Sequence, residues 1–239
     1  MPHRASAFDP YPPALATCQL CPRLVEYRRR VAREKRKAYM NEEYWGAPVP
    51  GFGDPDARLL LVGLAPGAHG SNRTGRMFTG DASGAFLYPA LYRAGLASSP
   101  VAVSRGDGLE LRGVWITAAL RCVPPGNKPL RGELAACQRW LHHDLDGVKN
   151  ARVALAMGKI GHDAAVGAWR SRGLQTTLAA NKFAHGAVHD LSSLPGAAAS
   201  GALTLVDVYH VSFQNTNTGR LTEAMFDEVL AHAKALAGL

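Results

Sequence analysis

The stretch Arg58-Leu-Leu-Leu-Val-Gly-Leu64 carries the strongest fold signal in the chain. It is apolar almost throughout, which is typical of a strand buried on both faces in a parallel sheet. The next segment, Ala65-Pro-Gly-Ala-His-Gly70, is a predicted loop at the carboxyl end of this strand, where parallel sheets bind ligands. Gly67 and Gly70 would let the backbone approach a ligand closely, although a tight strand-to-helix connection without function is the alternative.

The rest of the chain alternates between strand and helix patterns. Three more apolar segments predict strands at 114–119, 152–157 and 203–209. Helices are predicted from Pro22 to about Tyr39, from Asp81 to Leu96, and over 131–146, 159–171 and 221–237. Pro89 lies inside the second helix, where we expect a kink or an early end, and 51–55 and 192–201 are predicted loops. This alternation predicts an α/β fold whose parallel sheet is covered by helices on both faces.

Length and charge limit the class of protein. The 239 residues suffice for one α/β domain over 1–239, with the polar, Pro-rich residues 1–14 loosely ordered. Lys and Arg outnumber Asp and Glu by 27 to 19, which favours nucleic acid as a partner over the alternative of a merely basic protein. No apolar run could span a bilayer and the N-terminus lacks an apolar signal core, so we expect no membrane association and a cytoplasmic location. The first predicted helix carries much of the positive charge. We expect most of its basic side chains to form a solvated face, and contact with the DNA backbone is the alternative. These residues are Arg28, Arg29, Arg30, Arg33, Lys35, Arg36 and Lys37.

Four cysteines indicate a metal centre. Cys18 and Cys21 form a CxxC pair, and Cys122 and Cys137 follow far along the chain. Disulfides are disfavoured without a secretion signal, and a thioredoxin-like redox pair would follow a strand. Zinc and an iron–sulfur cluster both remain, with spacing alone slightly favouring zinc, and four unrelated buried thiols are the further alternative. Such a centre would tie the N-terminal helix to the loop after the second strand.

Three stretches together resemble a known family. They are Gly63-Leu-Ala-Pro-Gly67 with Arg76-Met-Phe-Thr-Gly-Asp81, then Trp115-Ile-Thr-Ala-Ala-Leu-Arg-Cys122-Val-Pro-Pro-Gly-Asn127, and His210-Val-Ser-Phe-Gln-Asn-Thr-Asn-Thr-Gly-Arg220. In this order, with the four cysteines interleaved, they resemble the iron–sulfur branch of the uracil-DNA glycosylase superfamily, and most of all its broad-specificity family 5. The resemblance covers about residues 15–237, whereas each motif alone would be weak.

This resemblance has direct implications for fold, activity and cofactor. It implies a three-layer α/β/α sandwich with a central four-stranded parallel sheet. It implies a hydrolase of base excision repair that flips uracil out of double-stranded DNA and breaks its N-glycosidic bond. It also implies a structural [4Fe-4S] cluster on Cys18, Cys21, Cys122 and Cys137, which reverses the slight preference for zinc.

Glycosidic cleavage leaves an electron-poor sugar and an anionic base, so an enzyme can assist at both ends. The resemblance assigns water positioning and sugar stabilisation to Asp81, although Asp is also a favoured helix N-cap. Leu64 stands where related families carry an acid or amide, and it cannot activate water. Asn127 either assists catalysis or orders a turn. His210, at the end of the fourth strand, could donate a hydrogen bond to the departing base, whereas His69 and His185 are expected to be structural.

The remaining expectations concern base and DNA binding. Phe78 is expected to stack on the flipped base. Ala118 replaces the Asn with which stricter relatives contact the base edge, so we expect acceptance of hypoxanthine or modified uracils as well. The expected substrate-binding residues are Gly63, Leu64, Ala65, Pro66, Gly67, Phe78 and Ala118. The expected DNA contacts are Ser71, Asn72, Arg73, Arg76, Ser212, Gln214, Asn215 and Arg220.

The predicted enzyme acts as a monomer. Two other classes fit parts of the sequence: a non-catalytic nucleic-acid-binding module with a structural four-cysteine metal site, and a doubly wound enzyme acting on free nucleosides. The first has no use for Asp81 or His210, and the second would bind DNA with little salt dependence.

Overall fold

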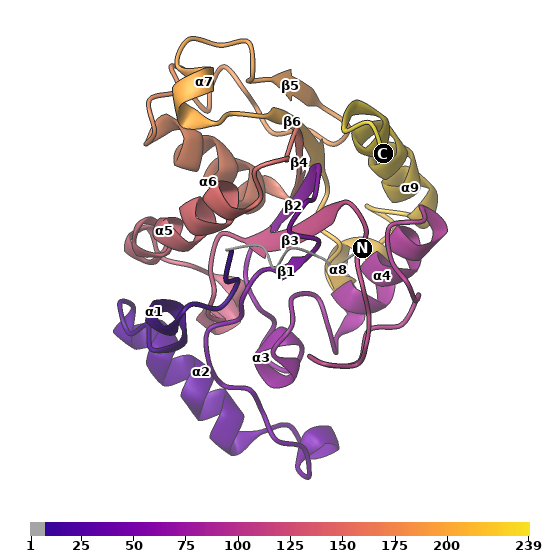
Figure 1. Cartoon of the computed structure of the whole chain (residues 1–239). Helices are drawn as coiled ribbons and strands as arrows, with labels where there is room; N and C mark the ends of the chain where they lie inside the picture. Colours follow the sequence, from indigo (N-terminus) through magenta and orange to yellow (C-terminus); the bar gives the residue numbers. More distant parts are fainter. Residues whose placement is uncertain (1–7) are drawn as a thin grey trace, which may run out of the picture.

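The structure, a computed structural model, describes residues 8–239 and centres on a six-stranded sheet of order β1-β3-β2-β4-β6-β5 (Figure 1). Four adjacent strands run parallel: β3 (Val114–Ala118), β2 (Leu59–Gly63), β4 (Val153–Met157) and β6 (Thr204–Val208). Nearly all their residues are buried, which explains why their sequences are apolar almost without interruption. The four strands predicted from the sequence are therefore confirmed.

Two short antiparallel strands extend the sheet at its edges, so the expectation of four strands is incomplete. β1 (Phe52–Gly53) pairs with β3, and β5 (Val188–Asp190) pairs with β6. β1 has only two residues and lies in the predicted loop 51–55. The outer residues of β5 are exposed and the strand lacks an apolar pattern. Neither edge strand carries the signal of a buried strand.

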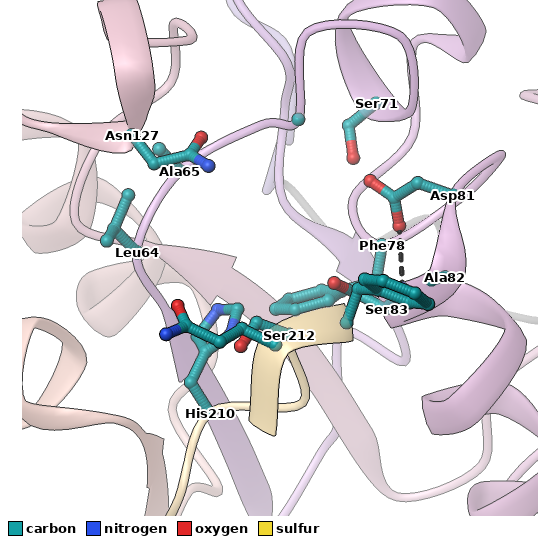
Figure 2. A pocket seen from close by; sticks show the side chains of 13 residues that line it. Leu64, Ala65, Ser71, Phe78, Asp81, Ala82, Ser83, Asn127, His210 and Ser212 are labelled. Carbon is teal, nitrogen blue, oxygen red and sulfur yellow. Dashed lines mark hydrogen bonds between the residues drawn. The ribbon is translucent and has the colours of Figure 1, made fainter. Parts of the chain in front are cut away.

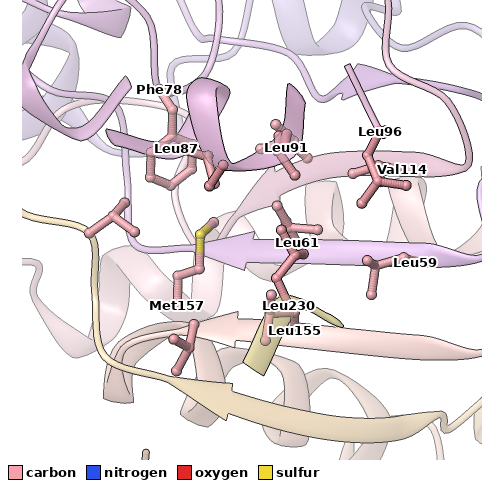
Figure 3. Close-up of a cluster of buried hydrophobic side chains, with 14 of the residues drawn as sticks. Leu59, Leu61, Phe78, Leu87, Leu91, Leu96, Val114, Leu155, Met157 and Leu230 are labelled. Atoms are coloured by element: carbon pink, nitrogen blue, oxygen red, sulfur yellow. The ribbon is translucent and has the colours of Figure 1, made fainter. Parts of the chain in front are cut away.

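Helices cover both faces of the sheet and confirm the three-layer α/β/α arrangement. α4 (Ala82–Arg93) and α9 (Glu223–Leu236) lie on one face, and α5 (Arg131–Gly147) and α6 (Lys159–Arg170) on the other (Figure 1). Because side chains alternate along a strand, Leu61 of β2 packs with Leu87 of α4 and Leu230 of α9 (Figure 3). Its neighbour Leu60 packs with Trp169 of α6 on the opposite face.

Three helical predictions need correction. α2 (Pro22–Glu34) ends before Tyr39, because Lys35 adopts a positive φ of 55° and a separate 3-10 turn, η1 (Lys37–Tyr39), follows. Of the kink or early end expected at Pro89, the early end does not occur: α4 continues to Arg93, with buried residues on both sides of Pro89 packed against the core. The predicted loop 192–201 contains a short helix, α7 (Ala197–Ser200).

Short helices absent from the sequence prediction follow the strands at their carboxyl ends. They are α3 (Ser71–Thr74), η2 (Pro125–Asn127) and α8 (Phe213–Asn217). The segments of α3 and α8 were predicted to bind DNA, and η2 contains Asn127, which was predicted to assist catalysis or order a turn. Such short turns lack the length over which helical periodicity is detectable.

The N-terminal segment packs on the body of the molecule. The Phe8 ring lies 5.2 Å from that of Trp115, and α1 (Pro13–Ala16) buries Leu15. The loose order expected for 1–14 therefore does not extend over residues 8–14, and residues 1–7 lie outside the described part. No helix among residues 8–239 is long and apolar enough to cross a membrane.

A buried carboxylate on β6 fastens the segment 181–190 to the sheet. Asp207 is fully buried and accepts hydrogen bonds from His162 Nδ1 at 2.7 Å and His189 Nε2 at 3.1 Å. His162 also contacts the Asn181 carbonyl oxygen through Nε2 at 2.8 Å, and the Ala184 amide donates to Asp207 at 3.3 Å. Both carboxylate oxygens of Asp207 are therefore occupied by partners within the fold.

Candidate active site

A pocket of about 490 Å³ lies at the carboxyl ends of the parallel strands. It brings together the three expected catalytic residues Asp81, Asn127 and His210 from three separate segments. Asp81 and Asn127 reach into it from opposite sides (Figure 2). Phe78 contributes a further wall. The sequence prediction that these residues share one site is consistent with this geometry.

The two carboxylate oxygens of Asp81 have different surroundings: one caps a helix and the other faces the pocket. Asp81 is the N-cap of α4, where Oδ1 accepts hydrogen bonds from the amides of Ser83 at 3.0 Å and Gly84 at 3.2 Å. Within the described residues Oδ2 has no hydrogen-bond partner. Burial raises the pKa of Asp81, and the two cap bonds and the charge of Arg73 oppose this shift. Asp81 thus caps the helix and still keeps one oxygen free.

Two glycines make room for that free oxygen. A Cβ atom on Gly67 would lie 2.5 Å from Asp81 Oδ2, and a Cβ on Gly70 would lie closer still. The sequence suggested that these glycines allow a ligand to approach the backbone. In the structure they allow a carboxylate to approach it instead.

Arg73 holds the segments on either side of Asp81. Its Nε donates to the His69 carbonyl oxygen at 2.8 Å and its Nη2 to the Gly80 carbonyl oxygen at 3.0 Å. It also pairs with Glu42 and lies over the Tyr39 ring at 3.9 Å. All three guanidinium nitrogens thus have partners within the fold. The structure therefore favours a role for Arg73 in positioning Asp81 over the expected contact with DNA.

Two more expected DNA contacts point inward. Arg76 is buried and forms two hydrogen bonds to Asp107, at 2.6 Å and 2.5 Å. Asn72 is buried and donates to the Arg28 carbonyl oxygen at 3.2 Å. Since DNA cannot reach either side chain without unfolding the segment, we remove both from the candidate contacts. Ser71 is buried as well but lines the pocket.

The segment after β6 keeps its predicted place at the rim. Ser212 and Gln214 line the pocket, and Asn215 Nδ2 donates to the His210 carbonyl oxygen at 2.8 Å. Asn215 therefore positions His210 from behind. Arg220 lies over the Tyr209 ring, 4.7 Å from its centroid.

Phe78 adopts a backbone conformation that is unusual for a bulky residue. Its φ is +52°, a strained value that persists only where the surroundings enforce it. A Cβ on Gly63 would lie 2.6 Å from the Phe78 ring, so the ring packs directly over the end of β2. The ring centroid lies 6.2 Å from that of His210. Phe78 is thereby held as one wall beside His210.

Asn127 combines both roles that the sequence left open. It has a φ of +56° in the turn η2, for which Asn is well suited. Its side chain lines the pocket and makes no hydrogen bond within the described residues. The turn therefore presents a free amide to the site.

The imidazole of His210 is neutral at physiological pH. Burial lowers the pKa of His210 to about 4. A neutral ring carries one N–H that can donate to an oxygen without adding charge. His69 and His185 lie outside this pocket, with His69 Nδ1 3.1 Å from the Tyr44 hydroxyl and His185 stacked on Tyr209 at 4.7 Å.

Part of the expected base-binding set lies beneath the pocket. Leu64, Ala65 and Gly67 line it, whereas Gly63 and Pro66 do not. Ala118 is buried in the core opposite Gly63 and also does not line the pocket. Sequence reasoning missed Phe213, which is 64% exposed at the rim, because α8 itself was not predicted.

The four cysteines meet as the sequence predicted. Cys18 and Cys21 flank the start of α2, and they pack with Cys122 after β3 and Cys137 of α5. Burial raises the pKa of the Cys122 thiol to about 12 and that of Cys137 to about 11, so deprotonation here requires a cation. The Arg121 amide donates to Cys137 Sγ at 3.3 Å.

The family model for the uracil DNA glycosylase superfamily matches residues 50–234. The chain therefore belongs to this superfamily, as the motifs around Asp81, Asn127 and His210 suggested. Within it, the chain is 54% identical over 225 residues to the type-5 uracil-DNA glycosylase of Thermus thermophilus, covering 94% of this chain and 96% of that protein. It is 44% identical to the type-5 enzyme of Pyrobaculum aerophilum over 233 residues, 97% of this chain and 94% of that one.

Similarity to a second branch is more limited. The type-4 uracil-DNA glycosylase of Pyrobaculum aerophilum is 38% identical over 113 residues, which cover 47% of this chain and 50% of that protein. The resemblance to the type-5 family is therefore confirmed.

Proposed function

We propose that the protein is a monofunctional uracil-DNA glycosylase that starts base excision repair by hydrolysing the N-glycosidic bond of uracil in double-stranded DNA. The observation that carries the proposal is the free Oδ2 of Asp81, which shares a pocket with the neutral imidazole of His210. A carboxylate and a neutral donor in one pocket suit a reaction that forms positive charge on a sugar and negative charge on a base. The type-5 relatives support the same activity.

The residues divide the reaction between its two ends. The flipped uracil stacks on Phe78 and its oxygen accepts a hydrogen bond from His210. The C1′–N1 bond breaks with its electron pair remaining on the base, and Asp81 stabilises the cationic sugar. Water held by Asp81 and Asn127 adds to C1′, its proton passes to the carboxylate, and the uracil anion regains a proton from solvent.

We extend the substrate range to other deaminated bases, including hypoxanthine and modified uracils. The pocket wall at Leu64 and Ala65 has no side-chain donor or acceptor for the base edge. A site rejects an analogue strongly when binding that analogue would leave buried polar groups of the site unpaired. This part of the wall has no such polar side chain. A Leu64→Gln variant adds a polar group to this wall, and equal excision of hypoxanthine by both proteins would remove the basis of the extension.

We also propose that Cys18, Cys21, Cys122 and Cys137 hold a [4Fe-4S] cluster with a structural role. When bound, the cluster would supply the charge that keeps the buried thiols deprotonated and would fasten α2 to α5. Iron and sulfide analysis of anaerobically purified protein should give four of each per chain. A colourless protein containing one zinc would contradict this assignment.

The function is tested on a labelled duplex with one U·G pair, followed by alkaline cleavage of abasic sites. We expect a cut at uracil that is absent from a C·G control and lost in a folded Asp81→Ala variant. Uncut DNA, despite salt-sensitive binding and an intact metal centre, would instead indicate a non-catalytic nucleic-acid module. The single domain over 1–239, the monomeric state and the cytoplasmic location remain predictions, and sedimentation of the free protein tests the monomer.

A further inference from the structure

A second hollow of about 450 Å³ adjoins the pocket on the far side of Asp81. Gly67, Asp81, Ala82 and Asn127 line both, so the two spaces meet at the expected position of the reacting sugar. The outer wall of the second hollow comes from α2 and η1. Neither element contributes to the pocket itself.

The outer wall of this hollow is cationic and aromatic. Arg36 is exposed there and forms no ion pair or side-chain hydrogen bond within residues 8–239. Tyr27 and Tyr39 flank it. Arg73 lies under Tyr39 but is already paired with Glu42. Arg36 is therefore the guanidinium in this wall that is available to an anion.

His69 also lines the hollow, and its pKa reflects the positive charge around it. Burial lowers this pKa most, and the charges of Arg36 and Arg73 lower it further. Arg36 and the nearby Arg73 therefore place positive charge beside the hollow, and the acid that lines it, Asp81, has one oxygen committed to its helix cap. This is the electrostatic setting that attracts a phosphodiester.

The path of a flipped nucleotide identifies the occupant. If the base lies between Phe78 and His210, the sugar lies at Asp81 and Asn127, and the backbone must leave on both sides of that sugar. One side leads past α8 at the pocket rim, and the other leads into the second hollow. We propose that this hollow binds the phosphodiester next to the flipped nucleotide on the damaged strand, with Arg36 on the phosphate and Tyr27 and Tyr39 against the adjoining sugar. The proposal rests on the glycosylase function.

The test pairs a protein variant with a DNA modification. The probe is a duplex carrying 2′-fluoro-deoxyuridine opposite guanine, which resists loss of its base, with a neutral methylphosphonate replacing either flanking phosphate. We expect Arg36→Gln to weaken binding of the unmodified probe about tenfold and to lower the salt slope by about one. One of the two methylphosphonates should weaken wild-type binding by a similar factor and leave Arg36→Gln unaffected.

Arg33→Gln is the matched control, because it removes one exposed charge from the last turn of α2, three residues before Arg36, but does not line the hollow. It should keep its sensitivity to both methylphosphonates. Equal losses for Arg36→Gln and Arg33→Gln, or additive effects of Arg36→Gln with both modifications, would overturn the proposal while leaving the glycosylase function intact. Failure of wild type to prefer the 2′-fluoro probe over a C·G duplex would overturn the function itself.

Discussion

Two carboxylates near the carboxyl ends of the strands have opposite circumstances. Asp207 is fully buried, and imidazoles and a backbone amide occupy both its oxygens. Asp81 uses one oxygen to cap α4 and presents the other, which has no partner among residues 8–239, to a pocket. Residue type therefore does not separate structure from function here. The difference is that one oxygen of Asp81 can still accept a hydrogen bond from a ligand. The following changes test whether Asp207 serves stability and Asp81 serves activity.

Asp207→Ala should give the largest effect. It leaves His162 and His189 without their acceptor in a buried site, so we expect the free energy of unfolding to fall by about 3–5 kcal/mol. Denaturant unfolding measures the loss, with exposed Asp190→Ala as the control. The excision rate per folded molecule should change little, and a large loss of rate at unchanged stability would reverse the comparison.

Asp81→Asn should do the opposite. Asn is a good N-cap, so the variant keeps the bonds to Ser83 and Gly84 and its melting temperature should stay near wild type. Without the negative charge, single-turnover excision of uracil should slow about 100-fold or more. A variant that cuts at the wild-type rate would transfer the main role to Asn127 or His210.

The pH profile should show one acid limb, and it should belong to Asp81. The reaction needs the carboxylate, and burial raises the pKa of Asp81, so the rate should fall as pH drops through a value above the ordinary 3.8. The decline below it is about tenfold per pH unit. His210, with its pKa lowered to about 4, stays neutral over pH 5–8 and adds no limb there. A limb that persists in Asp81→Asn would contradict this assignment.

Gly67→Ala should give the smallest of these effects. The new Cβ would lie 2.5 Å from Asp81 Oδ2 and would turn the carboxylate away from the pocket. We expect the rate to fall about tenfold with little change in stability, because displaced catalytic groups lose much of their effect. Gly132→Ala, where the added Cβ meets no atom within 4 Å, is the control and should cut normally.

The parts of the fold that were predictable have patterns longer than one turn. The four buried strands and the long helices follow from apolar runs and helical spacing. The edge strands β1 and β5, and the turns α3, η2 and α8, are too short to leave such a pattern. The end of α2 depends on a left-handed Lys35, a residue type that gives no warning of this conformation.

The sequence predicted which segments form the candidate site, but not which way their side chains point. The motifs located Asp81 at the start of α4, His210 just after β6, and Asn127 in the segment between β3 and α5. Arg76 lies in the same motif but faces inward to Asp107, which lies far along the chain. The roles of Gly67 as space for a carboxylate and of Arg36 as a free cation depend on contacts between segments that no local pattern specifies.

The positions of the four cysteines along the chain determine when their site can form during synthesis. Cys18 and Cys21 leave the ribosome first, but the thiols they pack with arrive only with β3 and α5. The four-cysteine site therefore stays incomplete until Cys137 emerges, after β2 and β3 and before β4 and β6 leave the ribosome. Because chains begin to fold from the N-terminus as they are made, the four cysteines can come together while β2 and β3 are the only parallel strands available. A nascent chain halted when Cys137, but not yet β4, has left the ribosome should already protect its four thiols from alkylation.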